Sequence, residues 1–195
     1  MRNDATIYLI RHGETDWNAQ SRYQGQADIP MNALGRAQAR RNGEALRALL
    51  PAIADATYVA SPLQRARETM EIVRGALDLE PRAYTLDDRL KELHYGHWQG
   101  IYATDLAALD APGLEARIRD TFRWRPEGGE SYADLMTRAV AWLDDVVGDT
   151  VITTHGGISR VLRGHLYGID PTLVPELEVP QDRILVLRRD GMQWL

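Results

Sequence analysis

The stretch TIYLIRHG, residues 6–13, decides the fold class. Its first five residues are apolar or β-branched, in a run of the length that is typical of a buried strand. Arg11, His12 and Gly13 follow this strand at once. In an open sheet of parallel strands, ligands bind beyond the carboxyl ends of the strands. The three residues after the strand are therefore candidates for a binding or catalytic site.

Outward from this stretch, segments of strand and helix character alternate. Strands are expected at residues 57–60, 82–85, 150–154 and 183–187. Helices are expected at residues 32–50, 61–74, 131–147 and 158–167. This alternation predicts a three-layer α/β/α domain with a largely parallel central sheet. The strands at 57–60 and 150–154 are also followed by polar segments, at 61–65 and 155–157, so three such segments should meet at one edge of the sheet.

Local signals indicate where one helix begins and ends. Ser61 is expected to cap it, with Pro62 at the first helical position and Gln64 completing a capping box. Gly75 is the expected C-terminal stop. Pro51 is the expected stop of the helix before it.

Residues 86–130 contain several glycines and prolines and have no clear periodicity. We expect loops and short helices there, forming a small cap-like insertion over a site. The helix that follows is expected to have Ser131 as its cap. A chain of 195 residues most often forms one domain, so residues 1–195 are expected to be a single domain.

Composition excludes several classes of function. The net charge of −5 argues against nucleic acid as the main partner, because a phosphate backbone needs a basic protein face. The chain has no cysteine, so disulfides and thiolate metal sites are excluded. No apolar run approaches the ~20 residues of a membrane span, and the run at 7–10 is too short for a signal peptide. We therefore expect a cytoplasmic protein without a membrane partner.

Two of the five histidines stand out. His12 and His155 each follow an expected strand, and each precedes a glycine, which lets the backbone approach a ligand closely. Such a pair could bind a metal ion or perform acid–base or nucleophilic chemistry. The metal interpretation is less favoured, because Arg11 adjoins His12 and no acidic cluster completes a ligand set. Together with Arg65, these residues suit a phosphoryl group, whose oxygens need preorganised cations.

Five segments together resemble the motifs of the histidine phosphatase superfamily, the phosphoglycerate mutase-like group. In chain order they are RHGETDWN at 11–18, RYQG with Asp28 and Pro30 from 22, SPLQRARET at 61–69, LKELHYGHWQG at 90–100 and THGG at 154–157. GGES at 128–131 resembles a further family element, whereas PQDR at 180–183 stands where the family often has Pro-Asn-x-Ser/Thr. The resemblance covers residues 6–168 and implies the phosphoglycerate mutase-like fold.

The resemblance implies a role for each matched residue. His12 would attack phosphorus and carry the phosphoryl group, and Glu92 would protonate the leaving oxygen and then activate water. The phosphoryl oxygens would be held by Arg11, Arg65, His155 and the neutral donor Asn18. Further substrate contacts would come from the motif residues Gln24, Gly25, Tyr95 and Gly156. A nucleophilic histidine must be neutral, so we expect a backbone carbonyl near Gly13 to hold the other ring nitrogen of His12.

Two pairs of residues have open roles. Arg123 and Arg125 could reach a substrate tail, and they could equally be solvated surface residues. His94 and His97 have an H-x-x-H spacing that could suggest a metal site, but two ligands in a loop are weak evidence. Structural or substrate-edge roles are favoured for these histidines.

The expected function is hydrolysis of small phosphomonoesters, with no metal and no cofactor. The alternative is a cofactor-dependent phosphoglycerate mutase, because His94 and Tyr95 before Gly96 resemble the mutase form of the motif. A mutase needs extra structure to exclude water from its intermediate, and the span between Gly100 and the strand at 150–154 is short. A third possibility is a phosphate-binding module without turnover, but such a module has no need of an acid such as Glu92. The physiological substrate and the oligomeric state stay open.

Overall fold

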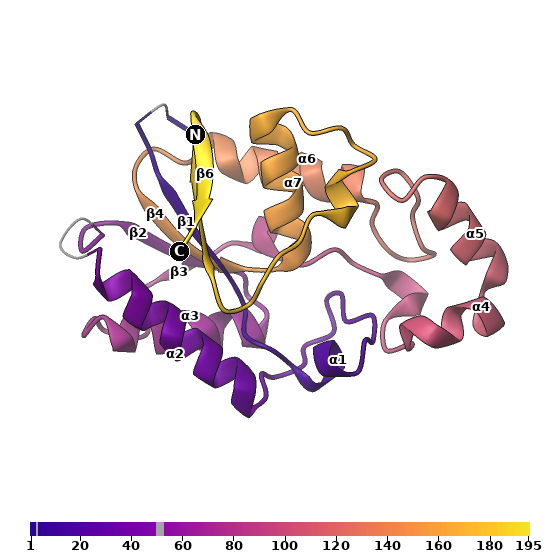
Figure 1. Ribbon diagram of the computed structural model, residues 1–195, viewed down its shortest axis with the longest axis horizontal. Coiled ribbons are helices and arrows are strands. Elements are labelled where there is room, and N and C mark those ends of the chain that lie inside the picture. Colours follow the sequence, from indigo (N-terminus) through magenta and orange to yellow (C-terminus); the bar gives the residue numbers. More distant parts are fainter. Residues whose placement is uncertain (3, 50–52) are drawn as a thin grey trace.

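A mixed β-sheet lies at the centre of the molecule (Figure 1). The computed structural model describes residues 1–2, 4–49 and 53–195, and within them six strands form one sheet in the order β3-β2-β4-β1-β5-β6. The strands are β1 (Ile7–Arg11), β2 (Thr57–Ala60), β3 (Thr85–Leu86), β4 (Thr150–Thr154), β5 (Ile184–Arg188) and β6 (Gly191–Trp194). Strands β3, β2, β4 and β1 run parallel, and β5 and β6 are antiparallel to their neighbours. The sheet is therefore largely parallel, as predicted.

Helices cover both faces of the sheet. Figure 1 shows α2 (Ala33–Arg47) and α3 (Gln64–Ala76) along one face, and α6 (Tyr132–Asp144) and α7 (Gly156–Tyr167) along the other. Successive residues of a strand point to opposite faces. Accordingly, Ile7 and Leu9 of β1 pack in a core with α6 and α7, whereas Tyr8 and Ile10 pack in a second core with α2 and α3. The two cores give the expected three layers.

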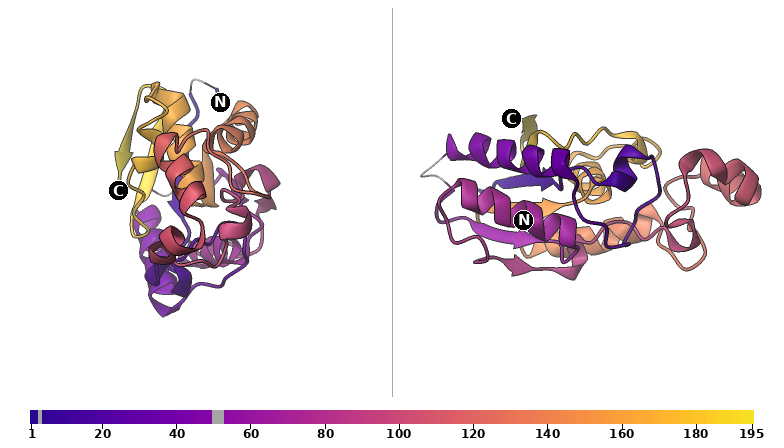
Figure 2. Two further views of the ribbon diagram at one scale, coloured as in Figure 1. Left: turned by 90° about the vertical axis from the view of Figure 1, so that its right-hand side faces the viewer. Right: turned by 90° about the horizontal axis from the view of Figure 1, so that it is seen from below.

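Short elements at one end of the molecule connect β3 to α6. They are the 3-10 helices Asp88–Leu90, Gly96–Trp98 and Ala103–Asp105 and the helices α4 (Leu106–Leu109) and α5 (Ala111–Arg119). Figure 2 shows α4 and α5 standing out beyond the end of the sheet. The remaining short helices are α1 (Asp16–Ala19) and the 3-10 helix Val174–Glu176. Of the helices in the described ranges, none has both the length and the apolar character to span a membrane.

The predicted start of α3 is wrong. The helix begins at Gln64, three residues after Ser61, and no side chain of its own start caps it. The hydroxyl of Ser61 lies 2.7 Å from Nε2 of His155 and accepts from the N–H of Leu63, which precedes the helix, so it caps no helical N–H. The first helical N–H, that of Gln64, is instead satisfied by the carboxylate of Asp28 at 2.7 Å. Gly75 lies inside the helix, which ends at Ala76.

Other boundaries moved by smaller amounts. The strand expected at 82–85 is a two-residue strand at Thr85–Leu86, and the helix expected from 158 begins at Gly156. Strand β6 was not predicted, because its short sequence GMQW lacks a strand pattern. Ser131 does cap α6, in a capping box with Asp134. Pro51, the predicted stop of α2, lies outside the described residues.

Candidate active site

The predicted polar segments meet at one edge of the sheet. Strand β4 lies between β1 and β2, and the backbone N–H groups of His12 and Ser61 bond to the carbonyls of Thr154 and Thr153. A cavity of about 300 Å³ opens there. The described residues that line it are Arg11, His12, Asn18, Ser21, Arg22, Tyr23, Gln24, Gly25, Arg65, Glu92, Tyr95, Ala103, Gly156 and Arg160.

His12 is buried and oriented by its own backbone. Its Nδ1 lies 2.8 Å from the carbonyl oxygen of Gly13, so Nδ1 carries the proton and donates it. This is the predicted carbonyl partner, and it leaves Nε2 unprotonated, so that its lone pair accepts from Nε of Arg65 at 3.2 Å. Burial, followed by the charges of Arg65 and Arg11, holds the pKa of His12 well below its ordinary value. His12 is therefore a neutral imidazole at physiological pH.

Gly13 lets this loop lie against the first turn of α2. A Cβ atom at Gly13 would collide with the backbone carbonyl of Gly35. A Cβ atom at Gly35 would in turn collide with the backbone of Glu14. Because both backbones touch directly, the position of the His12 carbonyl partner is set by the helix behind it.

Arg65 is fully buried beside His12. Its guanidinium donates to the carbonyls of Gly25 at 2.7 Å and Ala27 at 2.8 Å, and its Nε lies 3.2 Å from Nε2 of His12. With the Gln24 amide turned so that its oxygen faces Arg65, that oxygen accepts from Arg65 at 2.7 Å and 3.0 Å. Burial lowers the pKa of Arg65 to about 10, which still leaves it charged at neutral pH. The loop at 24–27 thus holds a positive charge next to the histidine.

His155 and Arg11 each present an unpartnered nitrogen at this site. The ring of His155 is 5.1 Å from that of His12 between centroids, and its Nε2 is bonded to Ser61. Its Nδ1 and the Nε of Arg11 are buried without a hydrogen-bond partner among the described residues. Such groups cost roughly 1–3 kcal/mol each when unsatisfied. An anionic oxygen within hydrogen-bond distance of either nitrogen would satisfy it. Burial, then Arg65 and His12, lowers the pKa of His155 well below its ordinary value.

Glu92 lies at the start of α7. One of its carboxylate oxygens accepts from the backbone N–H of Leu93 at 2.8 Å, and both accept from that of Gly157, at 3.1 Å and 3.3 Å. The N-terminus of a helix favours negative charge nearby. All of these partners are backbone groups, so the carboxylate reaches the cavity from a position that main-chain atoms determine.

Asn18 also faces the cavity. Its side-chain oxygen accepts from the N–H of Thr15 at 3.2 Å and from Nε2 of Gln181 at 3.3 Å. Gln181 also donates to the carbonyl of His12 at 3.1 Å. The segment that departs from the family pattern at 180–183 thus contacts the site through Gln181.

The structure separates the predicted site residues into three groups. His155 is fully buried beside the ring of His12 and is not among the described residues that line the cavity. Nine line the cavity, namely Arg11, His12, Asn18, Gln24, Gly25, Arg65, Glu92, Tyr95 and Gly156. Arg123 and Arg125 do not line it. They form ion pairs with Asp120 and Asp134 at the surface, and their side chains are 73% and 59% exposed. The suggestion that they reach the substrate tail is therefore not supported by their positions.

Sequence reasoning missed two other arginines, Arg22 and Arg160. The guanidinium of Arg22 stacks between Trp17 at 4.4 Å and Tyr102 at 4.8 Å. Nε of Arg160 donates to the carbonyl of Leu177 at 2.8 Å. No carboxylate of the described ranges lies within ion-pair distance of either. The signal for Arg160 was its spacing of four from Gly156, which puts both on one face of a helix.

His94 and His97 contact the chain around them. Nδ1 of His94 accepts from the N–H of Gly96, and Nε2 of His97 lies 3.1 Å from the carboxylate of Asp110. Asp110 also accepts from the indole of Trp98. Within the described part of the chain, no group of three or more histidine, aspartate or glutamate side chains is arranged to hold a metal ion.

Known proteins are similar to this chain in sequence and in fold. The chain matches the model of the histidine phosphatase superfamily (branch 1) over residues 7–195. It is 34% identical over 175 residues to the glucosyl-3-phosphoglycerate phosphatase of Mycolicibacterium vanbaalenii, covering 84% of this chain and 74% of that protein. It is 36% identical over 194 residues to the probable phosphoglycerate mutase GpmB of Salmonella paratyphi C, covering 97% and 87%. A solved mycobacterial glucosyl-3-phosphoglycerate phosphatase with VO3 is similar at a TM-score of 0.80 and 31% identity, covering 98% and 96% of the two chains.

Proposed function

The chain belongs to the histidine phosphatase superfamily, and from that premise we propose that it hydrolyses small phosphomonoesters without a metal ion, through a phosphohistidine on His12. One observation carries the proposal. Nδ1 of His12 donates to the carbonyl of Gly13, which leaves Nε2 unprotonated at a cavity lined by arginines, with Nε of Arg65 donating to its lone pair at 3.2 Å. A nitrogen of this kind, beside fixed positive charges, is suited to attack on phosphorus.

In the first step, the phosphoryl group of the ester lies among Arg11, Arg65 and His155. Nε2 of His12 attacks phosphorus in line, and the N–P bond forms as the ester P–O bond breaks. Protonated Glu92 gives its proton to the departing oxygen, so the alcohol leaves neutral. Nδ1 of His155 and Nε of Arg11, the two unpartnered nitrogens, donate to the phosphoryl oxygens.

In the second step, a water molecule attacks the phosphohistidine. Glu92, now a carboxylate, takes a proton from this water, and the P–N bond breaks. Inorganic phosphate leaves, and both His12 and Glu92 return to their starting states. The protein supplies position and charge throughout, which is the main requirement of phosphoryl transfer.

The cavity also favours a class of substrate. Arg22 and Arg160 line it in addition to the two arginines that hold the phosphoryl group, and Glu92 is its single acidic residue among those described. This surplus of positive charge suits an ester that carries a second anionic group. Two of the similar proteins reported above are glucosyl-3-phosphoglycerate phosphatases, and the carboxylate of a phosphoglycerate is such a group. We assign the recognition of that group to Arg160, in place of Arg123 and Arg125.

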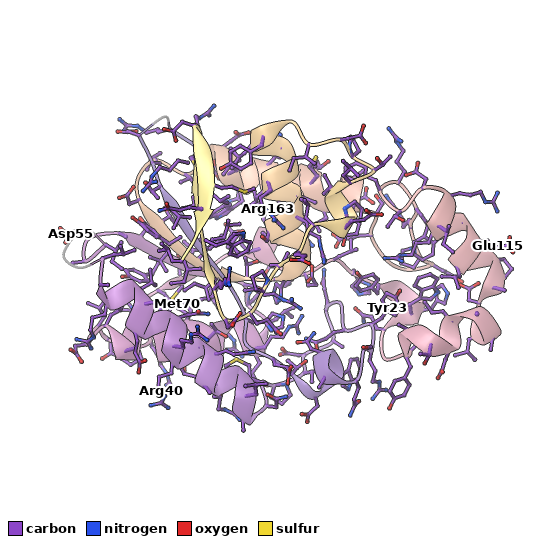
Figure 3. The ribbon with its side chains drawn as sticks, in the orientation of Figure 1. Tyr23, Arg40, Asp55, Met70, Glu115 and Arg163 are labelled. Atoms are coloured by element: carbon purple, nitrogen blue, oxygen red, sulfur yellow. The ribbon has the colours of Figure 1, made fainter. Side chains whose placement is uncertain are left out.

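We also infer that residues 1–195 work as one domain whose segment 86–130 covers the cavity. Tyr95 and Ala103 of this segment line the cavity. Tyr23 lies between the sheet and this segment (Figure 3), and its ring is 4.9 Å from that of Tyr95 and 5.3 Å from that of Trp98.

Trapping the intermediate tests the reaction. The protein is incubated in EDTA with p-nitrophenyl phosphate and, separately, with a radiolabelled phosphomonoester, and is then quenched in alkali. We expect hydrolysis and a protein-bound label that alkali leaves intact and acid releases. His12→Asn should lose both, because a nucleophile is not replaced by its neighbours. A strict need for added divalent metal, or label retained in His12→Asn, would refute the proposal.

A matched pair of esters tests the substrate class. 3-Phosphoglycerate and glycerol 3-phosphate differ in the carboxylate, and kcat/KM should be higher for the first. A hydrogen bond to a charged group is worth about 1.5–3 kcal/mol. Arg160→Met should therefore reduce the preference about tenfold to about 150-fold, while Arg123→Met, at the surface, should not change it. An unchanged preference in Arg160→Met would remove Arg160 from substrate recognition.

A further inference from the structure

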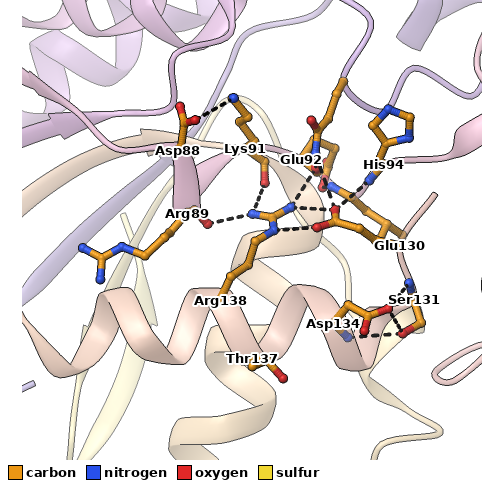
Figure 4. A network of polar contacts seen from close by, with 12 residues as sticks. Asp88, Arg89, Lys91, Glu92, His94, Glu130, Ser131, Asp134, Thr137 and Arg138 are labelled. Carbon is orange, nitrogen blue, oxygen red and sulfur yellow. Dashed lines mark hydrogen bonds and ion pairs between the residues drawn. The ribbon is translucent and has the colours of Figure 1, made fainter. Parts of the chain in front are cut away.

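Arg138 lies outside the cavity, yet it contacts the backbone that carries Glu92 (Figure 4). It projects from α6, and its side chain is 19% exposed. Nη1 donates to the carbonyls of Arg89 at 2.7 Å and Lys91 at 2.6 Å, and Nη2 donates to that of Glu92 at 2.9 Å. One guanidinium therefore binds three carbonyl groups in four consecutive residues that end at Glu92.

Glu130 completes this contact from the other side. Its two carboxylate oxygens accept from Nε and Nη2 of Arg138, each at 2.9 Å, in a bidentate pair. One of these oxygens also accepts from the backbone N–H of His94 at 3.0 Å. Burial opposes the charge of Glu130, but Arg138 and the His94 amide hold its pKa below the ordinary value. The ion pair is thus hydrogen-bonded to the backbone before Glu92, at Arg89 and Lys91, and after it, at His94.

Gln26 connects the same pair to the nucleophile's side of the site. Its Nε2 donates to the carbonyl of Glu92 at 2.9 Å and lies 3.5 Å from Glu130. Its neighbours Gly25 and Ala27 supply the carbonyls that hold Arg65 beside His12. The segment that carries Glu92 and the loop that holds Arg65 are therefore joined through this contact.

Glu92 depends on this support because its carboxylate has backbone partners only. A proton is transferred efficiently only over hydrogen-bond distance, and a misplacement of about 1 Å can cost about a hundredfold in rate. Arg138 uses the planar fork of its guanidinium at full capacity, and a lysine cannot reproduce that geometry. An ion pair that only joined α6 to the neighbouring loop would not need hydrogen bonds from one guanidinium to three successive backbone carbonyls as well.

We propose that Arg138 and Glu130 form a positioning pair that holds Glu92 at the distance from which its proton reaches the leaving oxygen. The inference rests on the proposed function, in which Glu92 is the general acid. Neither residue of the pair touches substrate. The pair affects the reaction only by setting the position of the Glu92 carboxylate.

Leaving-group dependence tests the proposal. Single-turnover formation of phosphoenzyme is measured with an alkyl phosphate, whose alkoxide needs a proton, and with p-nitrophenyl phosphate, whose phenolate can leave without one. Arg138→Lys keeps the charge and removes the fork, and Glu130→Gln is a milder second variant. Each should slow the alkyl ester by about tenfold to about a hundredfold and the p-nitrophenyl ester much less. In a Glu92→Gln background, Arg138→Lys should add almost nothing, because no proton remains to be placed.

Arg89→Met is the matched control. Its side chain joins the same segment to the same helix, through the carbonyl of Ala141 and the carboxylate of Asp145, but does not contact Glu92. It should lower the melting temperature without changing the ratio of the two rates. Equal losses for both esters in Arg138→Lys and Glu130→Gln, or an undiminished loss in the Glu92→Gln background, would reduce the pair to a structural role. Equal losses in Glu92→Gln alone would instead refute the general acid and, with it, this inference.

Discussion

Ser61→Ala is the substitution whose effect follows most directly from the structure. The hydroxyl of Ser61 lies 2.7 Å from Nε2 of His155, and both groups are buried. If Nδ1 of His155 is to donate to the phosphoryl group, Nε2 must be unprotonated and must accept the proton of Ser61. Because the N–H of Leu63 donates to the hydroxyl oxygen of Ser61 at 3.4 Å, the hydroxyl proton is left for Nε2, which favours the productive tautomer of His155. Alanine at this position removes that selection and leaves Nε2 without a partner.

The magnitude can be worked from these contacts. An unsatisfied buried nitrogen costs about 1–3 kcal/mol of folding free energy. In the other tautomer, a lone pair of Nδ1 would face the phosphoryl oxygens, so the hydrogen bond to a charged group, worth about 1.5–3 kcal/mol, is lost. Since each 1.36 kcal/mol is a factor of ten in rate, phosphoenzyme formation should slow by about tenfold to about 150-fold.

The assay is single-turnover phosphoenzyme formation together with urea unfolding. Unlike changes at Glu92, this loss should be the same for alkyl and p-nitrophenyl phosphates, because in the proposed reaction His155 would hold the oxygens that stay on phosphorus. Ser159→Ala is the control, since the buried hydroxyl of Ser159 has no partner among the described residues. It should leave the rate of phosphoenzyme formation unchanged and should not lower the urea midpoint, because it removes a buried hydroxyl that has no partner to lose. A Ser61→Ala protein with the wild-type rate would show that the tautomer of His155 is set in another way.

Three further outcomes are expected. With 3-phosphoglycerate and a 2,3-bisphosphoglycerate primer, the protein should release phosphate and form little 2-phosphoglycerate; efficient isomerisation would favour the mutase. Burial lowers the pKa values of His12 and His155 below 6.5, so below that pH the unfolded chain binds more protons than the folded protein. The urea midpoint should therefore fall as the pH drops from 7 to 5, and it should fall less in a His12→Gln variant. A pH-independent midpoint would contradict the buried neutral histidines. Gly13→Ala should destabilise the fold by about 1–3 kcal/mol and slow phosphoenzyme formation, since its Cβ would meet the backbone of Gly35; wild-type values in both urea unfolding and single turnover would show that the two backbones can separate freely.

Features that depend on near neighbours in sequence could be predicted. The family and the fold are confirmed. The carbonyl partner of His12 is that of Gly13, the next residue in the chain, as predicted. The contacts that could not be predicted join distant residues. Ser61 contacts His155, 94 residues away, although its local sequence looks like a helix start. Asp28 accepts from the first N–H of α3, 36 residues away. The arginines were the hardest to judge, because an arginine in a cavity and one at the surface look the same in sequence. Arg160 and Arg125 could be told apart only by the residues that fold around them.

The order of strands has a consequence for how the chain is made. Strand β1 is the first strand of the sheet to be synthesised, but its neighbours, β4 and β5, lie about 140 and about 175 residues further along. Until those arrive, the apolar run of β1 has no partner in the sheet. Strand pairings between residues so far apart in sequence form slowly, and a hydrophobic strand that is still unpaired is prone to aggregate. The nascent protein should therefore depend on protection of its first strand, and the buried surroundings of His12 are complete only after β4 and β5 have joined the sheet.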